Sequence, residues 1–249
     1  MQQVTSIDGV ISALENIILD SEKNNDTSGY FAALYLKVTK QVKKGIENNE
    51  FEDGPRMEKL DVIFASRYLD AYRAWKNNQP VTDSWKKAFS LSTHYWPIVL
   101  QHLLMGMNAH INLDLGIAAA EISKNKDINE LKNDFDKINE ILSSLVNEVQ
   151  DNLSKIWPTL KWILQKTRKV DDFLIDYSMQ LSRDGAWNFA GSIVNKPDGE
   201  LKILIADRDK KVADKSSIVT NTGLIARLIF GIIRIGERGS VKQKIEKLK

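Results

Sequence analysis

The sequence predicts an all-α protein, because apolar residues recur every three or four positions along nearly every segment. Glycine and proline are sparse, with 13 and 5 copies in 249 residues, which argues against a loop-rich β fold. No internal repeat and no low-complexity linker divides the chain. We therefore expect a single-domain multi-helix bundle over residues 1–249, with the first ~25 and the last ~10 residues peripheral.

Polar breaks at residues 24–29, 50–55 and 77–80 separate the first predicted helices. Thr82 or Asp83 suits the N-cap of a short helix, and Pro97 suits the first turn of a long one. The helical spacing predicts these segments in order: Val4–Leu19, Tyr30–Ile46, Arg56–Trp75, a short helix around Trp85, Pro97–Ser123, Asp127–Asn152, Val170–Ile193, Glu200–Ala213 and Leu224–Glu237.

The composition excludes several classes of protein. The net charge is +2 with acids and bases mixed along the chain, so no broad electrostatic footprint for nucleic acid is present. Cysteine is absent, which excludes disulfides, thiolate nucleophiles and metal–sulfur centres. The N-terminus has no signal-peptide pattern, and the longest apolar runs fall short of the ~20 residues that span a bilayer. We expect a soluble cytoplasmic protein with no nucleic-acid or membrane partner, and the oligomeric state stays open.

The most informative segment is QHLLMGMNAHINLDLG, residues 101–116 in the central predicted helix around residues 97–123. It holds His102 and His110, two of the three histidines, together with Asn108, Asn112 and Asp114. Buried helices rarely carry so many polar side chains without a use for them. This segment is therefore our candidate functional site. Asn108 is a candidate hydrogen-bonding partner for a substrate, and Asn112 is a candidate substrate-binding residue.

Helical spacing decides which of these residues can meet. His102 and His110 are eight residues apart, or ~12 Å along a straight helix, too far to share one zinc ion easily. His110 and Asp114 are four apart and can meet. They could bind one divalent metal ion, act as an acid/base histidine oriented by a carboxylate, or form a plain structural pair. Gly106 lies between the histidines, and close helix packing explains it better than a gap left for a ligand.

Other predicted helices offer supporting groups. Asp61, on the third predicted helix, could complete a metal site with His110 and Asp114, in the way that bundles build such sites. Arg67 is a candidate anchor for an anionic or carbonyl group, although an ordinary salt bridge also explains it. Candidate substrate-binding residues, each with an alternative packing role, are Asn112, Tyr68, Arg183 and Trp187.

Familiar catalytic motifs are absent. The sequence contains no phosphate-binding glycine loop, no G-x-S-x-G and no H-E-x-x-H. No Glu stands three residues before a histidine, so the E-x-x-H pairs of di-iron bundles are missing. The pattern therefore points to a site without naming its reaction.

Three ordered pieces of the chain resemble a family. They are YFAALYLKVTKQV with FEDGPRMEKLDVIFASRYLDA, then QHLLMGMNAHINLDLG, then RDGAWNFA followed by IADRD. Together they resemble the uncharacterised bacterial domain-of-unknown-function family 5995, over residues 30–237. The resemblance implies an all-helical single-domain protein and carries no activity. The motif positions that it implies are Asp61, Arg67, His102, Asn108, His110, Asn112, Asp114, Arg183 and Trp187.

Two hypotheses of function follow. In the first, the protein is an enzyme on a small molecule, with His110 as general acid or base and Asp114 orienting it. His102 or Arg67 would position an anionic or carbonyl group, and Asn108 would hydrogen-bond the substrate. A metal-assisted hydrolase, with His110, Asp114 and Asp61 holding one ion, is its variant. In the second, the protein is a non-catalytic helical module that binds a small apolar ligand or a partner protein, and the polar residues are structural.

Overall fold

The computed structural model describes residues 4–157, 179–220 and 224–249. Every regular element in these residues is helical, which confirms the all-α prediction. The α-helices are α1 (Ile7–Asn24), α2 (Gly29–Glu47), α3 (Gly54–Lys76), α4 (Asp83–Ser90), α5 (Val99–Ala109), α6 (Leu115–Ile122), α7 (Lys132–Ile156), α10 (Met179–Ile193), α11 (Asp198–Lys215), α12 (Ser217–Thr220), α13 (Leu224–Gly236) and α14 (Val241–Leu248). The predicted start of a helix at Val170 lies outside the described residues.

Asparagines end many of these helices. Five of them have a positive φ between 55° and 62°, a conformation that asparagine tolerates better than other residues with a side chain. Because the chain reverses direction at these points, the polar breaks seen in the sequence become tight turns between helices. They are Asn25, Asn49, Asn78, Asn125 and Asn195.

The central predicted helix is not a continuous α-helix. It consists of α5, a five-residue π-helix over His110–Asp114, and α6. The Leu115 N–H bonds the His110 carbonyl five residues earlier, which is the π pattern. Periodicity does not reveal such a change, because one wide turn leaves the apolar spacing nearly intact. The π-helix contains both members of the predicted His110–Asp114 pair.

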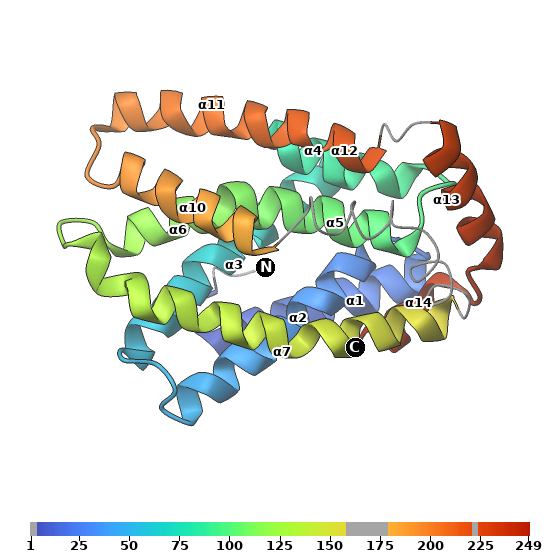
Figure 1. Cartoon of the computed structure of the whole chain (residues 1–249), viewed down its shortest axis with the longest axis horizontal. Coiled ribbons are helices and arrows are strands. Elements are labelled where there is room, and N and C mark those ends of the chain that lie inside the picture. The colour runs from blue at the N-terminus through green and yellow to red at the C-terminus, as the bar shows by residue number, and fades with distance from the viewer. Residues whose placement is uncertain (1–3, 158–178, 221–223) are drawn as a thin grey trace.

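This central segment crosses the middle of the molecule. Figure 1 shows α5 and α6 between α10 and α11 on one side and α1, α2 and α7 on the other. Small residues let the neighbouring helices approach. A Cβ on Gly116 would lie 2.8 Å from the carbonyl oxygen of Ala186 on α10, and one on Gly106 would lie 2.4 Å from the Phe31 ring on α2. Gly106 therefore marks close packing, as the sequence favoured.

Both ends of the chain contribute to the core, which differs from the peripheral position expected for them. In α1, Leu14 and Ile18 are buried, because their apolar stripe packs on α2. The last residues form α14, whose first turn is held by a capping box between Ser240 and Gln243. Ile245 and Leu248 of α14 are buried in the same apolar cluster as α1.

The short helix α4 has Thr82 as its N-cap residue, as predicted, but another side chain supplies the capping hydrogen bonds. Thr82 makes no side-chain cap, and the Asp209 carboxylate of α11 instead accepts hydrogen bonds from the N–H groups of Asp83 and Ser84, at 2.7 and 3.0 Å. An acid at a helix N-terminus satisfies free N–H groups and matches the helix dipole. Asp209 thus fixes α4 against α11 and positions Trp85 on α4.

No helix within the described part of the chain combines the length and the apolar character that crossing a membrane requires.

Candidate functional site

Three side chains donate hydrogen bonds to the buried Asp114 carboxylate. Arg67 Nε on α3 lies 2.7 Å from Oδ1, and Trp85 Nε1 on α4 lies 2.8 Å from Oδ2. His110 Nδ1, one turn earlier on the same segment, lies 3.2 Å from Oδ2. The Asp114 side chain is only 1% exposed, so these donors replace the water that an ionised carboxylate needs. Asp114 thereby joins α3, α4 and the π-helix.

Asp114 is ionised at neutral pH. Burial by itself raises the pKa of its carboxyl, but the Arg67 cation and the His110 hydrogen bond outweigh burial and leave the pKa below its ordinary value. An ionised carboxylate only accepts hydrogen bonds, so the His110 nitrogen facing it carries the proton. The free proton-accepting nitrogen of His110 is then Nε2.

The imidazole of His110 is held in place by rings. It stacks on Phe64 of α3, with ring centroids 3.6 Å apart and planes at 7°. Its Nε2 is buried and has no hydrogen-bond partner among the described residues. Burial lowers the pKa of His110, more strongly than the bond to Asp114 raises it. The ring is therefore neutral at pH 7, and its Nε2 lone pair accepts no hydrogen bond from the part of the chain that the structure describes.

Two tyrosines lie against the same imidazole. The Tyr35 ring centroid on α2 lies 4.6 Å from that of His110, and the Tyr68 centroid on α3 lies 6.0 Å from it. Their hydroxyls are buried and, like His110 Nε2, have no partner among the described residues. Burial raises the pKa of both phenols well above its ordinary value, so both remain protonated donors. Buried polar groups are normally paired, so three orphaned ones around one ring need an explanation.

Asp61 is a fourth unsatisfied group close by. It lies on α3 one turn before Phe64, and its Oδ2 is buried without a partner in the described residues. Burial, assisted by the charge of Glu58, raises the pKa of Asp61 to about 7. Its negative charge adds to the effect of burial in raising the pKa of the Tyr35 phenol. Asp61 is therefore partly protonated under neutral conditions.

The comparisons with known proteins identify a family. A family model described as a family of unknown function, DUF5995, matches residues 7–222. The chain belongs to this family. No curated protein and no solved structure matches it. The matched range contains all of the residues that surround His110 in this DUF5995 protein.

His102 of the DUF5995 chain is separate from the His110 cluster. Its ring packs edge-on against Tyr30, with ring centroids 5.5 Å apart. Burial, assisted by the charges of Arg234 and Lys244, lowers the pKa of His102 to about 3. This histidine is neutral at pH 7, and its ring neighbour Tyr30 differs from the groups that surround His110. The structure therefore does not bring His102 and His110 together.

Asn108 and Asn112 tie the central segment to α11. Asn108 Nδ2 donates to the Val212 carbonyl at 2.8 Å, and Asn112 Nδ2 donates to Asn108 Oδ1 at 3.0 Å. Arg208 Nε of α11 donates to the Asn112 carbonyl at 2.8 Å. These bonds use the amides in helix packing, which gives their polar character a structural reason.

Arg183 and Trp187 belong to a different part of the protein. Arg183 donates to the Phe135 carbonyl at the start of α7, and its guanidinium lies over the Phe135 ring. Trp187 also packs on the Phe135 ring, with ring centroids 4.9 Å apart. The two residues share Phe135 as a partner instead of stacking on each other, and neither contacts His110.

The residues do not fit a metal site. Within residues 4–157, 179–220 and 224–249, no group of three His, Asp or Glu side chains is arranged to hold an ion. Both oxygens of Asp114 already accept hydrogen bonds, and the Arg67 cation lies at bonding distance from one of them. A divalent cation would compete with that charge. His110, Asp114 and Asp61 therefore do not form the predicted metal site in the described residues.

Sequence reasoning missed the aromatic partners of this site. Trp85, Tyr35, Phe64 and Phe31 all have ring centroids within 6 Å of His110. Each follows the apolar stripe of its helix, so each reads as ordinary core. The sequence offers one signal for them. Tyrosine and tryptophan carry polar atoms, and here they lie on the apolar stripes of predicted helices, where those atoms become buried.

Proposed function

We propose that this protein is an enzyme that performs acid/base chemistry on a small uncharged molecule, with His110 Nε2 as the atom that accepts and returns the proton. The observation that supports this best is that Asp114 orients the imidazole through Nδ1, whereas Nε2 is buried and has no partner in residues 4–157, 179–220 and 224–249. A carboxylate behind a neutral histidine fixes the tautomer and stabilises the imidazolium that forms. Arg67 and Trp85 keep that carboxylate ionised and immobile.

Tyr35 and Tyr68 supply the second half of the chemistry. Both phenols lie against the imidazole and remain protonated because burial raises their pKa. Donors fixed in a water-poor site stabilise an oxygen on which negative charge develops. Proton removal next to a carbonyl, or attack of an activated hydroxyl on one, would use both elements. An uncharged substrate suits the site, because a buried charge would lose its hydration.

A specific observation favours a second candidate, a non-catalytic module in which the cluster is structural. Neither cavity described in the structure is lined by His110, Asp114 or the tyrosines. On this reading, Asp114 joins α3, α4 and the π-helix, and the orphaned groups are bridged by trapped water. Substrate entry on the first reading requires a neighbouring ring such as Phe64 to move.

Metabolite profiling of purified variants tests the proposal. The wild type and His110→Gln are each incubated with a small-molecule extract, and consumed compounds are identified by mass spectrometry. We expect a compound that the wild type consumes at least ~100-fold faster than His110→Gln, while the variant remains folded. His102→Gln is the matched control, because it removes the other buried histidine and should retain turnover. Equal consumption by wild type and His110→Gln would instead support the structural module.

A further inference from the structure

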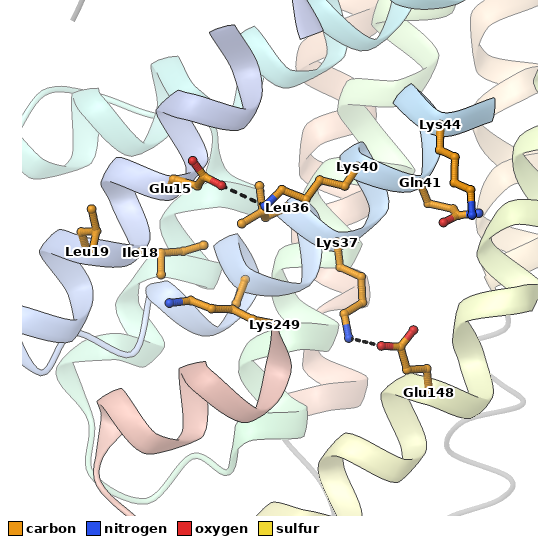
Figure 2. A pocket seen from close by; sticks show the side chains of 11 residues that line it. Glu15, Ile18, Leu19, Leu36, Lys37, Lys40, Gln41, Lys44, Glu148 and Lys249 are labelled. Carbon is orange, nitrogen blue, oxygen red and sulfur yellow. Dashed lines mark hydrogen bonds and ion pairs between the residues drawn. The ribbon is translucent and has the colours of Figure 1, made fainter. Parts of the chain in front are cut away.

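A groove lies on the opposite side of α2 from the His110 cluster. It has a volume of about 570 Å³, within the range of small-molecule sites, and is lined by α1, α2, α7 and the C-terminal residue Lys249. Figure 2 shows its side chains around α2. Phe31 and Tyr35 occupy the other face of α2, against His110. The groove is therefore a separate feature of the molecule.

The floor of the groove is apolar. Ile18 of α1 and Ala33 and Leu36 of α2 line it, and all three belong to the buried core. Leu19 also lines it and is 59% exposed. An alkyl segment lying in the groove would cover Leu19 and remove apolar surface from water.

The rim of the groove is basic. Lys37, Lys40 and Lys44 recur at helical spacing on α2, and Lys249 approaches from the end of the chain (Figure 2). Two glutamates, Glu15 and Glu148, also line the groove, and Lys249 pairs with a third, Glu22, at 2.5 Å. Lys37 pairs with Glu148 at 2.7 Å and Lys40 with Glu15 at 2.9 Å, whereas Lys44 has no ion pair among the residues drawn. The groove thus combines an apolar floor with a basic rim, on which Lys44 is the lysine that has no ion pair among the described residues.

We propose that this groove binds a small free amphiphile that has an alkyl segment and a single anionic head group. The alkyl segment lies on Ile18, Leu19 and Leu36, and the head group lies among Lys37, Lys40 and Lys44. Lysine acts as a point charge and makes no planar bidentate contact. The rim therefore selects the charge of the head group and accepts either a carboxylate or a phosphate shape.

The existing ion pairs do not block such a ligand. Glu15 and Glu148 are about half exposed, and exposed ion pairs contribute little to stability. An anionic head group can replace either glutamate as the partner of a lysine, and the released glutamate regains its water. Lys37 is only 10% exposed along its side chain, so the protein already holds its amine at the edge of the groove.

Calorimetric titration of the full chain tests the proposal with decanoate, kept below the concentration at which it forms micelles. We expect saturable binding at one site, weaker at high salt because the charges are screened. Decanol tests the alkyl segment without charge, acetate tests the head group alone, and vesicles of anionic phospholipid test a membrane source. Equal affinity for decanol, binding of acetate alone, binding only to vesicles, or no binding of decanoate would each overturn the proposal.

Variants assign the binding to this groove. Lys40→Met combined with Lys44→Met should weaken decanoate binding about fivefold to tenfold, because two cations are lost and the chain length is kept. Leu19→Ser should weaken it by removing apolar contact. Lys43→Met is the matched control, since Lys43 lies on the same helix, pairs with Asp8 and does not line the groove. A similar loss in the control variant would refute the assignment.

Discussion

Arg67 Nε lies 2.7 Å from Oδ1 of Asp114, although the two residues are 47 positions apart. Asp114 is almost fully buried, whereas Arg67 is 29% exposed along its side chain, so this pair runs from the interior to the surface. Trp85 donates to the other carboxylate oxygen from a third element. The carboxylate is thus the point at which α3, α4 and the π-helix are joined.

Replacing this carboxylate should destabilise the fold. In Asp114→Ala, Trp85 Nε1 loses its acceptor in a buried position, and Arg67 loses its counter-charge. Breaking a buried pair from one side costs about 3 kcal/mol or more. We expect a loss of that size in the free energy of unfolding, measured by urea denaturation monitored through circular dichroism.

The control for this prediction is Asp70→Ala. Asp70 also lies on α3 and pairs with an arginine, Arg73, at 3.0 Å, but this pair is exposed. Its loss should cost less than about 1 kcal/mol. If both variants unfold at the same urea concentration as the wild type, the Asp114 carboxylate does not hold α3, α4 and the π-helix together.

The sequence predicted what depends on local spacing. Apolar periodicity revealed the helices, and the four-residue separation revealed that His110 and Asp114 can meet. Contacts between distant segments were not predictable. Trp85 reaches Asp114 across 29 positions, and Asp209 caps α4 across 126. Such contacts depend on how helices cross, and a single chain carries no local signal for that.

The candidate site shows the same limit. The sequence does not distinguish the polar residues of the central segment from one another, but the structure places them in three environments. His110 stacks on Phe64, Asn108 bonds to α11, and His102 packs against Tyr30.

Asp61 should make stability depend on pH. Its pKa is about 7 when folded and 3.8 ordinarily, so between these values the folded protein holds a proton that the unfolded chain releases. Stability contributed by Asp61 is therefore lost as pH rises from about 4 to 7. Asp61→Asn keeps the group neutral. We expect it to match the wild type near pH 4 and to be more stable by a few kcal/mol at pH 8, measured by denaturation at each pH. A constant difference across this range would contradict the prediction.

His102 should make stability depend on pH in the opposite direction. Its pKa falls from 6.5 to about 3 on folding, so between these values the unfolded chain binds a proton that the folded protein excludes. Stability contributed by His102 is present above pH 6.5 and is lost as pH falls toward 3. His102→Gln does not titrate. The wild type should lose stability relative to this variant as the pH falls, measured by thermal unfolding, and a parallel decline of both proteins would refute the assignment.

Gly106→Ala should destabilise the protein although alanine favours helices. The added Cβ would lie 2.4 Å from the Phe31 ring, which packs on Tyr35, Tyr68 and His110. Overpacking costs about 1–3 kcal/mol, against a gain of about 1 kcal/mol in helix propensity. The control is Gly191→Ala on α10, where no atom lies within 4 Å of the new Cβ. Thermal unfolding should show a lower melting temperature for the first variant and an equal or higher one for the second.

Phe64→Ala should expose the imidazole that Phe64 covers. Phe64 is half-buried and stacks directly on His110, whose Nε2 has no partner in the described residues. Removing the ring opens a path from solvent to that nitrogen, so diethyl pyrocarbonate should modify His110 at least ~10-fold faster than in the wild type, as followed by peptide mass spectrometry. Exposed His94 measures the intrinsic rate in each sample. Phe89→Ala is the matched control, because it truncates a buried phenylalanine that stacks on Trp85 instead of His110. Equal acceleration in both variants would mean that general loosening, and not the Phe64 ring, controls access to the proposed catalytic nitrogen.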